Sequence, residues 1–225
     1  MLKAIIFDFD GVIADTEPLH LKAFQLTLEE EGITLLEEEY NESYLAYDDK
    51  TFFKELLKDR NIENDETKVS DFINRKSIHF NNILKGNILI LEGVLDFISS
   101  VSSKFPLSIG SGALRAEIVE ILEYAGLRKH FDIIVSADDV LNCKPNPEVY
   151  LKVLSQLNNT ASAQVLANEC LVIEDSISGL KAAQSAGMKC LAITNSYSAE
   201  DLSEAELITD SLKSISVNQI EDLFS

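Results

Sequence analysis

The chain has 225 residues, which is enough to bury a large core in one domain, or in one domain with a smaller one inserted into it. Its 19 basic and 38 acidic residues give a formal net charge of −19 at pH 7, which disfavours binding to nucleic acid or to an anionic membrane. The three cysteines have no CxxC spacing, so a disulfide framework or a zinc site is not expected. No apolar run reaches the roughly 18 residues of a membrane span. The cysteine usage predicts a reducing, cytoplasmic location, and a monomer is expected.

Short apolar runs typical of strands alternate with amphipathic helical patterns along most of the chain. In chain order, the pattern predicts strands at 4–9 and 106–110, a helix at 116–124, a strand at 132–135, a helix at 147–157, a strand at 170–173, a helix at 178–186, and strands at 189–193 and 206–209. The alternation predicts an α/β fold, in which a doubly wound parallel sheet is covered by helices.

One interval, from about residue 17 to residue 84, contains only helical patterns. Three apolar stripes at helical spacing begin there at Leu21, Phe52 and Val69. A block of helices that follows the first strand of a sheet is typical of an inserted domain. We therefore predict an α/β core of residues 1–15 and 86–225 with an α-helical cap domain of residues 16–85.

Two acids, Asp8 and Asp10, close the first predicted strand. Residues i and i+2 of an extended strand point the same way, so both carboxylates should face one spot. Such a pair repels unless a cation or a proton separates the two groups. The pair favours a metal site with one nucleophilic carboxylate and one acid or base, although a polar strand end is the simpler interpretation of an isolated DxD.

The second and third predicted strands are each followed by groups that suit a phosphate. Ser111 and Gly112 lie in a small-residue turn before a helix, where a hydroxyl and backbone N–H groups can bind an anion. Lys144 stands in a loop stiffened by Pro145 and Pro147, which would hold its ammonium in place. Each of these signals is weak alone, because small turn residues and loop lysines are common.

Glu174 and Asp175 close the fourth predicted strand. A pair of acids beside an apolar core is costly without a cation, and Mg²⁺ favours carboxylate oxygens. Ligands of an open parallel sheet bind outside the carboxyl ends of its strands, so all of these groups should meet at one edge. The coincidence of four such motifs predicts a magnesium-dependent phosphoryl-transfer site.

The motifs, in this order and spacing, resemble those of the haloacid dehalogenase superfamily of phosphohydrolases over nearly the whole chain. The residues that carry the resemblance are Asp8-Phe9-Asp10-Gly11-Val12-Ile13, Ser111, Lys144-Pro145 and Glu174-Asp175-Ser176. The helical insert is similar to the small cap of the β-phosphoglucomutase-like group. The resemblance implies that Asp8 attacks phosphorus to form an aspartyl phosphate, while Asp10 protonates the leaving group and then activates water or an acceptor hydroxyl.

The resemblance also implies the other roles at this site. Ser111 and Lys144 would hold the transferring phosphoryl group. A Mg²⁺ cofactor would be bound by Asp8, the backbone carbonyl of Asp10 and Asp175, with Glu174 as a further ligand or as a support. The acid at position 10 disfavours the dehalogenase and phosphonate-cleaving branches, because both lack it.

Substrate choice is expected to lie in the cap. Lys76 falls on the apolar line of the third cap stripe, so it either extends from the core edge to solvent or faces the cleft. The resemblance matches Arg75 and Lys76 to an Arg-Lys pair of the mutase, and His20 also matches. The stretch 47–51 has two acids and Lys50 where the mutase has an Arg that grips a second phosphate. The predicted substrate-binding residues are Gly11, His20, Lys50, Lys76, Ser111 and Gly112.

The sequence therefore predicts a phosphatase that hydrolyses a small phosphorylated metabolite, such as a sugar phosphate. Phosphoryl transfer within a hexose phosphate, as in β-phosphoglucomutase, is the alternative. A catalytically silent module that binds phosphate or metal is a third reading, and the presence of both Asp8 and Asp10 argues against it.

Overall fold

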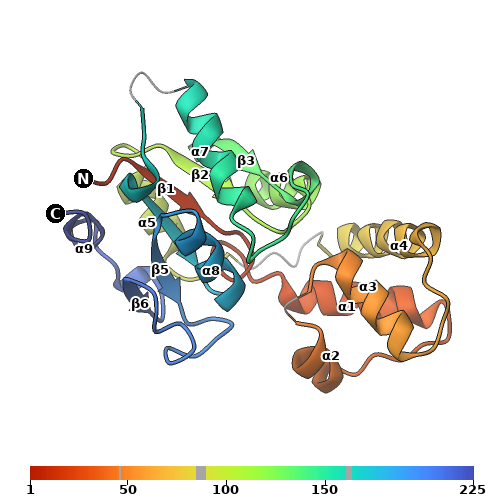
Figure 1. Cartoon of the computed structure of the whole chain (residues 1–225). Helices are drawn as coiled ribbons and strands as arrows, with labels where there is room; N and C mark the ends of the chain where they lie inside the picture. Colours follow the sequence, from red (N-terminus) through yellow and green to blue (C-terminus); the bar gives the residue numbers. More distant parts are fainter. Residues whose placement is uncertain (46, 85–89, 161–163) are drawn as a thin grey trace. The chain divides into compact units, whose positions relative to one another are not determined.

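The computed structural model of the protein describes residues 1–45, 47–84, 90–160 and 164–225 (Figure 1). The chain divides into two compact units, which we call the core unit (Met1–Asp15 with Leu89–Ser225) and the helical unit (Thr16–Ile88). The boundary predicted between residues 85 and 86 falls outside the described residues. Within the described ranges, no helix is both long enough and apolar enough to span a membrane.

The core unit is built on a six-stranded parallel sheet, which confirms the predicted α/β fold class. Its strands are β1 (Ala4–Phe7), β2 (Leu107–Gly110), β3 (Phe131–Val135), β4 (Cys170–Glu174), β5 (Lys189–Ile193) and β6 (Leu207–Thr209), in the spatial order β3-β2-β1-β4-β5-β6. The central strand β1 pairs with β2 on one side and β4 on the other, with Phe7 opposite Ile109 and Ile173. The chain order reverses at this strand, and such a switch point is where ligands bind in doubly wound sheets.

Both faces of the sheet are covered, which explains why the strands read as continuous apolar runs. The helices of the core unit are α5 (Val94–Val101), α6 (Arg115–Tyr124), α7 (Glu148–Thr160), α8 (Ile177–Ser185) and α9 (Val217–Asp222) (Figure 1). Ala4 and Ile6 of β1 belong to the hydrophobic cluster that includes α7 and α8. Phe7 points to the other face, where its ring centroid lies 6.2 Å from that of Phe97 in α5.

The predicted first strand is too long, because β1 ends at Phe7 rather than at residue 9. A tight turn follows, in which the Phe9 carbonyl accepts hydrogen bonds from the N–H groups of Val12, Ile13 and Ala14. Gly11 has a left-handed backbone (φ +70°), which a glycine adopts at little cost. The strand alternation invoked for Asp8 and Asp10 therefore stops short of Asp10, whose position is set by the turn.

The helical unit contains α1 (Glu17–Glu29), α2 (Glu37–Ser43), α3 (Asp49–Asp59) and α4 (Glu66–Leu84). These bounds agree with the helical character predicted for residues 17–84. Its core combines aromatic side chains with leucines and a valine, and the ring centroids of Phe24 and Phe52 lie 3.9 Å apart. The unit thus has its own hydrophobic core.

We expect Phe52→Ala to destabilise the helical unit by about 3–5 kcal/mol. The Phe52 ring is fully buried among the rings of Phe24, Tyr44 and Phe53, so its removal leaves a cavity. Urea unfolding followed by far-ultraviolet circular dichroism measures the free energy of unfolding. The control Ile78→Ala, at a side chain 61% exposed, should cost less than about 1 kcal/mol. Equal losses for the two variants would show that the aromatic cluster does not stabilise the unit.

Candidate active site

The polar groups predicted at the strand ends follow neighbouring strands of the sheet. Asp8 comes directly after β1, Ser111 after β2, and Asp175 after β4, while Lys144 lies in the loop between β3 and α7. The carboxyl ends of parallel strands open on the same edge, so chain segments far apart in sequence meet there.

The Lys144 ammonium lies between two carboxylates. Its Nζ is 2.9 Å from Asp8 Oδ1 and 2.6 Å from Glu174 Oε1, and it lies 5.0 Å from the centre of the Tyr150 ring. Burial alone would lower the pKa of Lys144, but the charges of Asp8 and Glu174 raise the pKa above its usual value. The side chain therefore stays a cation, held in place by its two partners.

Glu174 is fully buried, and both of its oxygens accept hydrogen bonds. Oε1 accepts from Lys144 Nζ and, at 2.5 Å, from the Tyr150 hydroxyl. Oε2 accepts from the Ser176 hydroxyl at 3.0 Å and from the N–H groups of Asp175 and Ser176 at 3.1 and 3.2 Å. Burial raises the pKa of Glu174, but the Lys144 charge and the hydrogen bonds from Lys144, Tyr150 and Ser176 together lower the pKa below its usual value, so the carboxyl stays ionised and anchors the ammonium.

Three carboxylates, of Asp8, Glu174 and Asp175, place one oxygen each within 4.8 Å of one another. Burial and the charges of Glu174 and Asp10, opposed by Lys144, together raise the pKa of Asp8 to about 7. Burial and the charges of Glu174 and Asp8 also raise the pKa of Asp175 well above its usual value. With all three carboxyls ionised, the cluster would carry more negative charge than one ammonium neutralises. A hard divalent cation fits this set of oxygen donors.

The backbone approaches these carboxylates closely at two glycines. A Cβ atom on Gly11 would lie 1.8 Å from Asp175 Oδ2, and one on Gly179 would lie 1.7 Å from Glu174 Oε1. A side chain at either position would displace a carboxylate. The site thus depends on the absence of side chains as well as on the charged groups.

Ser111 and Gly112 lie where β2 leads into α6. Ser111 is buried, and its hydroxyl oxygen accepts a hydrogen bond from the Ala113 N–H at 3.1 Å. Gly112 is exposed. Their contact with a phosphate stays a prediction, as does the substrate-binding role of Gly11.

Lys76 lies in α4 of the helical unit and is fully buried rather than extended into solvent. Its Nζ is 2.7 Å from His20 Nδ1 and 3.0 Å from Asp49 Oδ2, and it lies about 5 Å from the ring centres of Phe24 and Phe80. Burial and the Lys76 charge lower the pKa of His20 well below its usual value, so the imidazole is neutral and accepts the hydrogen bond. The roles of Lys76 and His20 in substrate binding stay predictions.

Lys50, in the first turn of α3, is exposed, and its Nζ lies 3.7 Å from Glu66 Oε1. An exposed ion pair of this kind contributes little to stability. The preceding Asp48 caps α3, because its side chain accepts a hydrogen bond from the Thr51 N–H at 2.7 Å. The substrate contact predicted for Lys50 likewise stays a prediction.

Three side chains of the site received no role from the sequence, although Ser176 stands in the Glu174-Asp175-Ser176 motif. Tyr150 follows the apolar stripe of a helix and reads there as a core residue. Ser176 caps α8, accepting a hydrogen bond from the Gly179 N–H at 3.0 Å, and a serine before a helix is a recognisable capping signal. Ser196, in the loop after β5, donates a hydrogen bond to Asp175 Oδ2, and no local pattern marks it.

The chain is similar to known proteins over most of its length. The model of the family described as "Haloacid dehalogenase-like hydrolase" matches residues 5–193. The chain is 34% identical over 192 residues to the phosphorylated carbohydrates phosphatase of Thermotoga maritima, covering 84% of this chain and 83% of that protein.

Solved structures resemble the whole chain. The β-phosphoglucomutase of Clostridium difficile matches with a TM-score of 0.86 at 26% identity, covering 100% of this chain and 97% of that one. A mutant CbbY of Rhodobacter sphaeroides, in complex with xylulose-1,5-bisphosphate, matches with a TM-score of 0.84 at 26% identity, covering 95% and 96%.

We expect Gly11→Ala to destabilise the protein more than Gly126→Ala, although both glycines have nearly the same left-handed backbone (φ +70° and +69°). A Cβ on Gly126 would meet no atom within 4 Å. The free energy of unfolding of Gly126→Ala should therefore fall only by the roughly 1–2 kcal/mol that a left-handed backbone costs a residue with a Cβ atom. Gly11→Ala should lose about 1–3 kcal/mol more, because it crowds Asp175. Free energies of unfolding in urea provide the comparison. Equal losses would mean that Asp175 moves away at no cost.

Proposed function

This chain belongs to the haloacid dehalogenase-like hydrolase family, and from that premise we propose that it is a Mg²⁺-dependent phosphatase that hydrolyses a phosphorylated sugar through an aspartyl phosphate on Asp8. The observation that carries the proposal is the ion pair between Asp8 and Lys144 within a cluster of three buried carboxylates. A carboxylate held beside an ammonium and a cation-binding group is suited to attack an anionic phosphoryl group, whose charge would otherwise repel it.

In the first half-reaction, an oxygen of Asp8 forms a bond to phosphorus as the bond between phosphorus and the ester oxygen breaks. Asp10 gives its proton to the departing oxygen, so the sugar leaves as a neutral alcohol. Lys144 offsets negative charge on the phosphoryl oxygens. The Ser111 hydroxyl and the backbone N–H groups after β2 orient the same oxygens.

In the second half-reaction, Asp10 takes a proton from a water molecule, whose oxygen attacks phosphorus. The bond between phosphorus and Asp8 breaks, and inorganic phosphate leaves. Both carboxylates are then back in their starting protonation states, so the cycle consumes one water molecule and needs no other reactant.

Asp8, Asp175 and the backbone carbonyl of Asp10 would hold the Mg²⁺ ion. When bound, the ion supplies positive charge that offsets the carboxylates and the phosphoryl oxygens. Glu174 acts as a support rather than as a ligand, because its oxygens already accept hydrogen bonds from Lys144, Tyr150 and Ser176.

The substrate class is supported by the 34% identity to the phosphorylated carbohydrates phosphatase of Thermotoga maritima. The likeness to β-phosphoglucomutase favours phosphoryl transfer within a sugar phosphate as a second candidate. The stretch around Asp49 argues for hydrolysis instead, because Asp49 places a carboxylate 3.0 Å from the buried Lys76 ammonium. A second phosphate is better held by a cation whose charge is not already offset by a carboxylate.

Release of inorganic phosphate from a panel of phosphorylated sugars, with and without EDTA, tests the proposal. We expect release that requires Mg²⁺ and that Asp8→Asn abolishes, because an amide cannot attack phosphorus. Asp132→Asn, at an exposed position of β3, is the control and should keep full activity. Conversion of one sugar phosphate to an isomer without phosphate release would identify the mutase reaction. Undiminished turnover by Asp8→Asn would rule out Asp8 as the nucleophile.

We also expect Asp175→Ala to raise the Mg²⁺ concentration needed for half-maximal rate by more than Glu174→Ala does. Removing Asp175 removes a ligand, whereas removing Glu174 releases Lys144 and should lower kcat at saturating Mg²⁺. Initial rates measured against Mg²⁺ concentration for both variants separate these effects. The opposite ranking would make Glu174 the ligand and Asp175 its support.

A further inference from the structure

The loop after β5 forms hydrogen bonds to both segments that carry the proposed metal ligands. Asn195 Nδ2 donates to the carbonyl oxygen of Gly11 at 2.7 Å, and the adjacent Ser196 donates through its hydroxyl to Asp175 Oδ2. Gly11 lies 184 residues away from Asn195 in sequence, so only the folded sheet brings them together. Two neighbouring side chains of one loop thus connect the turn after β1 to the end of β4.

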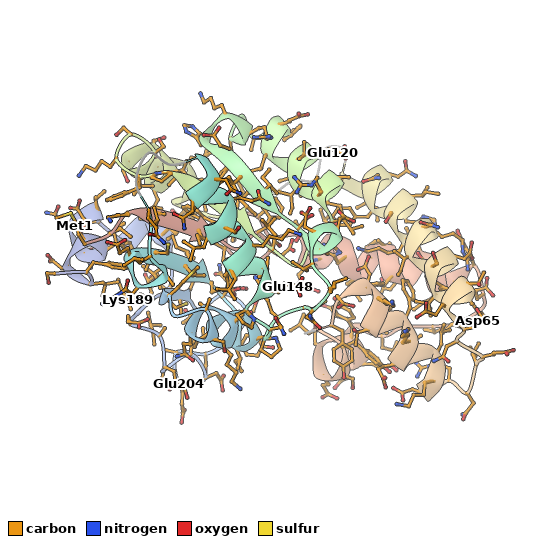
Figure 2. All side chains as sticks on the ribbon, turned by 45° about the horizontal axis from the view of Figure 1, so that its top comes forward. Met1, Asp65, Glu120, Glu148, Lys189 and Glu204 are labelled. Atoms are coloured by element: carbon orange, nitrogen blue, oxygen red, sulfur yellow. The ribbon has the colours of Figure 1, made fainter. Side chains whose placement is uncertain are left out.

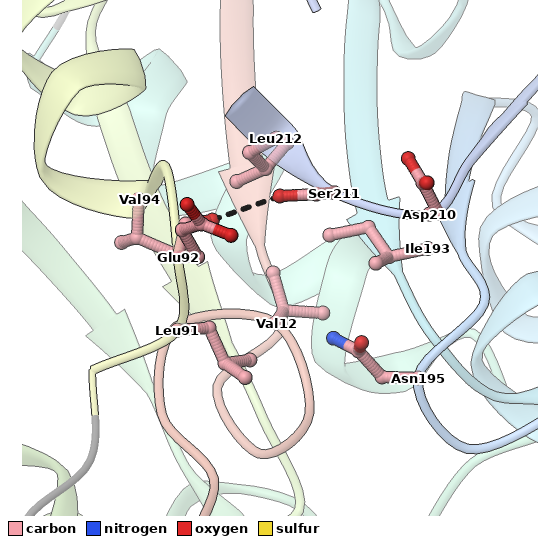
Figure 3. Close-up of a pocket in the computed structure, with 9 residues that line it drawn as sticks. All are labelled: Val12, Leu91, Glu92, Val94, Ile193, Asn195, Asp210, Ser211 and Leu212. Carbon is pink, nitrogen blue, oxygen red and sulfur yellow. Dashed lines mark hydrogen bonds between the residues drawn. The ribbon is translucent and has the colours of Figure 1, made fainter. Parts of the chain in front are cut away.

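The Gly11 carbonyl belongs to the turn that positions Asp10. In that turn the Gly11 N–H donates to the Ala14 carbonyl at 2.9 Å, and the Gly11 carbonyl accepts the hydrogen bond from Asn195. Figure 3 shows Asn195 and Val12 facing a small pocket that Leu91 and Ile193 also line. Val12, Leu91 and Ile193 are apolar and have no side-chain hydrogen-bond donor, whereas the Asn195 amide has one.

Asp175 Oδ2 lies between Ser196 and Gly11. The Ser196 hydroxyl donates to this oxygen, and a Cβ on Gly11 would come within 1.8 Å of it. Fixing one oxygen from two sides sets the plane of the carboxylate, and with it the direction of the other oxygen. Partners of this kind orient the ligands of metal sites, and losing them commonly weakens metal binding about 10- to 100-fold.

We propose that Asn195 and Ser196 are positioning residues of the metal site: Ser196 orients Asp175 for the cation, and Asn195 fixes the turn that carries Asp10. The inference rests on the proposed function, because it assigns these residues to the metal that the function requires. Both side chains are exposed, so neither is needed to fill the hydrophobic core. Their substitution should therefore change the site while leaving the fold intact.

Calorimetric titration with Mg²⁺ alone, without substrate, tests the role of Ser196. We expect Ser196→Ala to raise the Mg²⁺ dissociation constant about 10- to 100-fold, and Ser196→Thr, which keeps the hydroxyl, to restore it to within about threefold. Ser198→Ala is the matched control from the same loop, because the Ser198 hydroxyl donates to Asp201 instead. It should bind Mg²⁺ like the wild type.

Steady-state kinetics at saturating Mg²⁺ test the role of Asn195. We expect Asn195→Ala to lower kcat about three- to tenfold, the effect of losing one hydrogen bond of roughly 1 kcal/mol to the turn that holds the general acid. The melting temperature in EDTA should fall by no more than about 2–4 °C in either alanine variant, the shift expected from one lost hydrogen bond.

The outcomes separate this inference from the proposed function. If the wild type binds Mg²⁺ and Ser196→Ala binds it with the same dissociation constant, the positioning role of Ser196 alone is overturned, whatever the melting temperature in EDTA. An unchanged kcat in Asn195→Ala would overturn the positioning role of Asn195. A wild-type protein that neither binds Mg²⁺ nor needs it for turnover would overturn both the inference and the proposed function.

Discussion

The ammonium of Lys144 is the charge around which the active site is built. Its two partners, Asp8 and Glu174, stand at the ends of adjacent central strands. The side chains of Lys144 and Asp8 are only 10% and 11% exposed, and that of Glu174 is fully buried. Burying a charge without a partner costs several kcal/mol, so each carboxylate depends on this one cation. Asp175 adds a third carboxylate that a single ammonium cannot balance. The resulting excess of negative charge is what makes the site suited to a divalent cation and then to an anionic substrate.

The sheet meets this constraint by placing the charged groups at the ends of strands whose interiors are apolar. β1 pairs in register with β2 and β4, so Asp8 and Asp175 begin at nearly the same level. The space between them is then closed by backbone rather than by side chains, as the contact of Gly11 with Asp175 illustrates. Hydrogen bonds from Tyr150 to Glu174 and from Ser196 to Asp175 restrict the rotation of these two carboxylates. The site is therefore held mainly by elements that do not themselves react.

The helical unit meets a similar constraint by different means. Lys76 is buried there as well, yet its environment combines one carboxylate, Asp49, with the neutral imidazole of His20 and the faces of Phe24 and Phe80. Aromatic faces stabilise a cation while adding no negative charge. One carboxylate is thus enough at Lys76, whereas the Lys144 cluster has three. This difference in charge balance is why we place the cation site in the core unit.

Local patterns were sufficient to predict the α/β fold, the helical character of residues 17–84, and the motifs of Asp8, Lys144 and Glu174-Asp175, whose side chains lie together in the structure. Periodicity and strand-end motifs are properties of a few consecutive residues, so they can be read without knowing what lies opposite. The end of β1 could not be read in this way, because the turn at Gly11 depends on the space that Asp175 leaves for it. The burial of Lys76, which the apolar stripe left open, required knowing that Asp49 lies on a neighbouring helix. Tyr150 and Ser196 gained their partners only in the folded protein, since hydrogen bonds between distant segments depend on the positions of both.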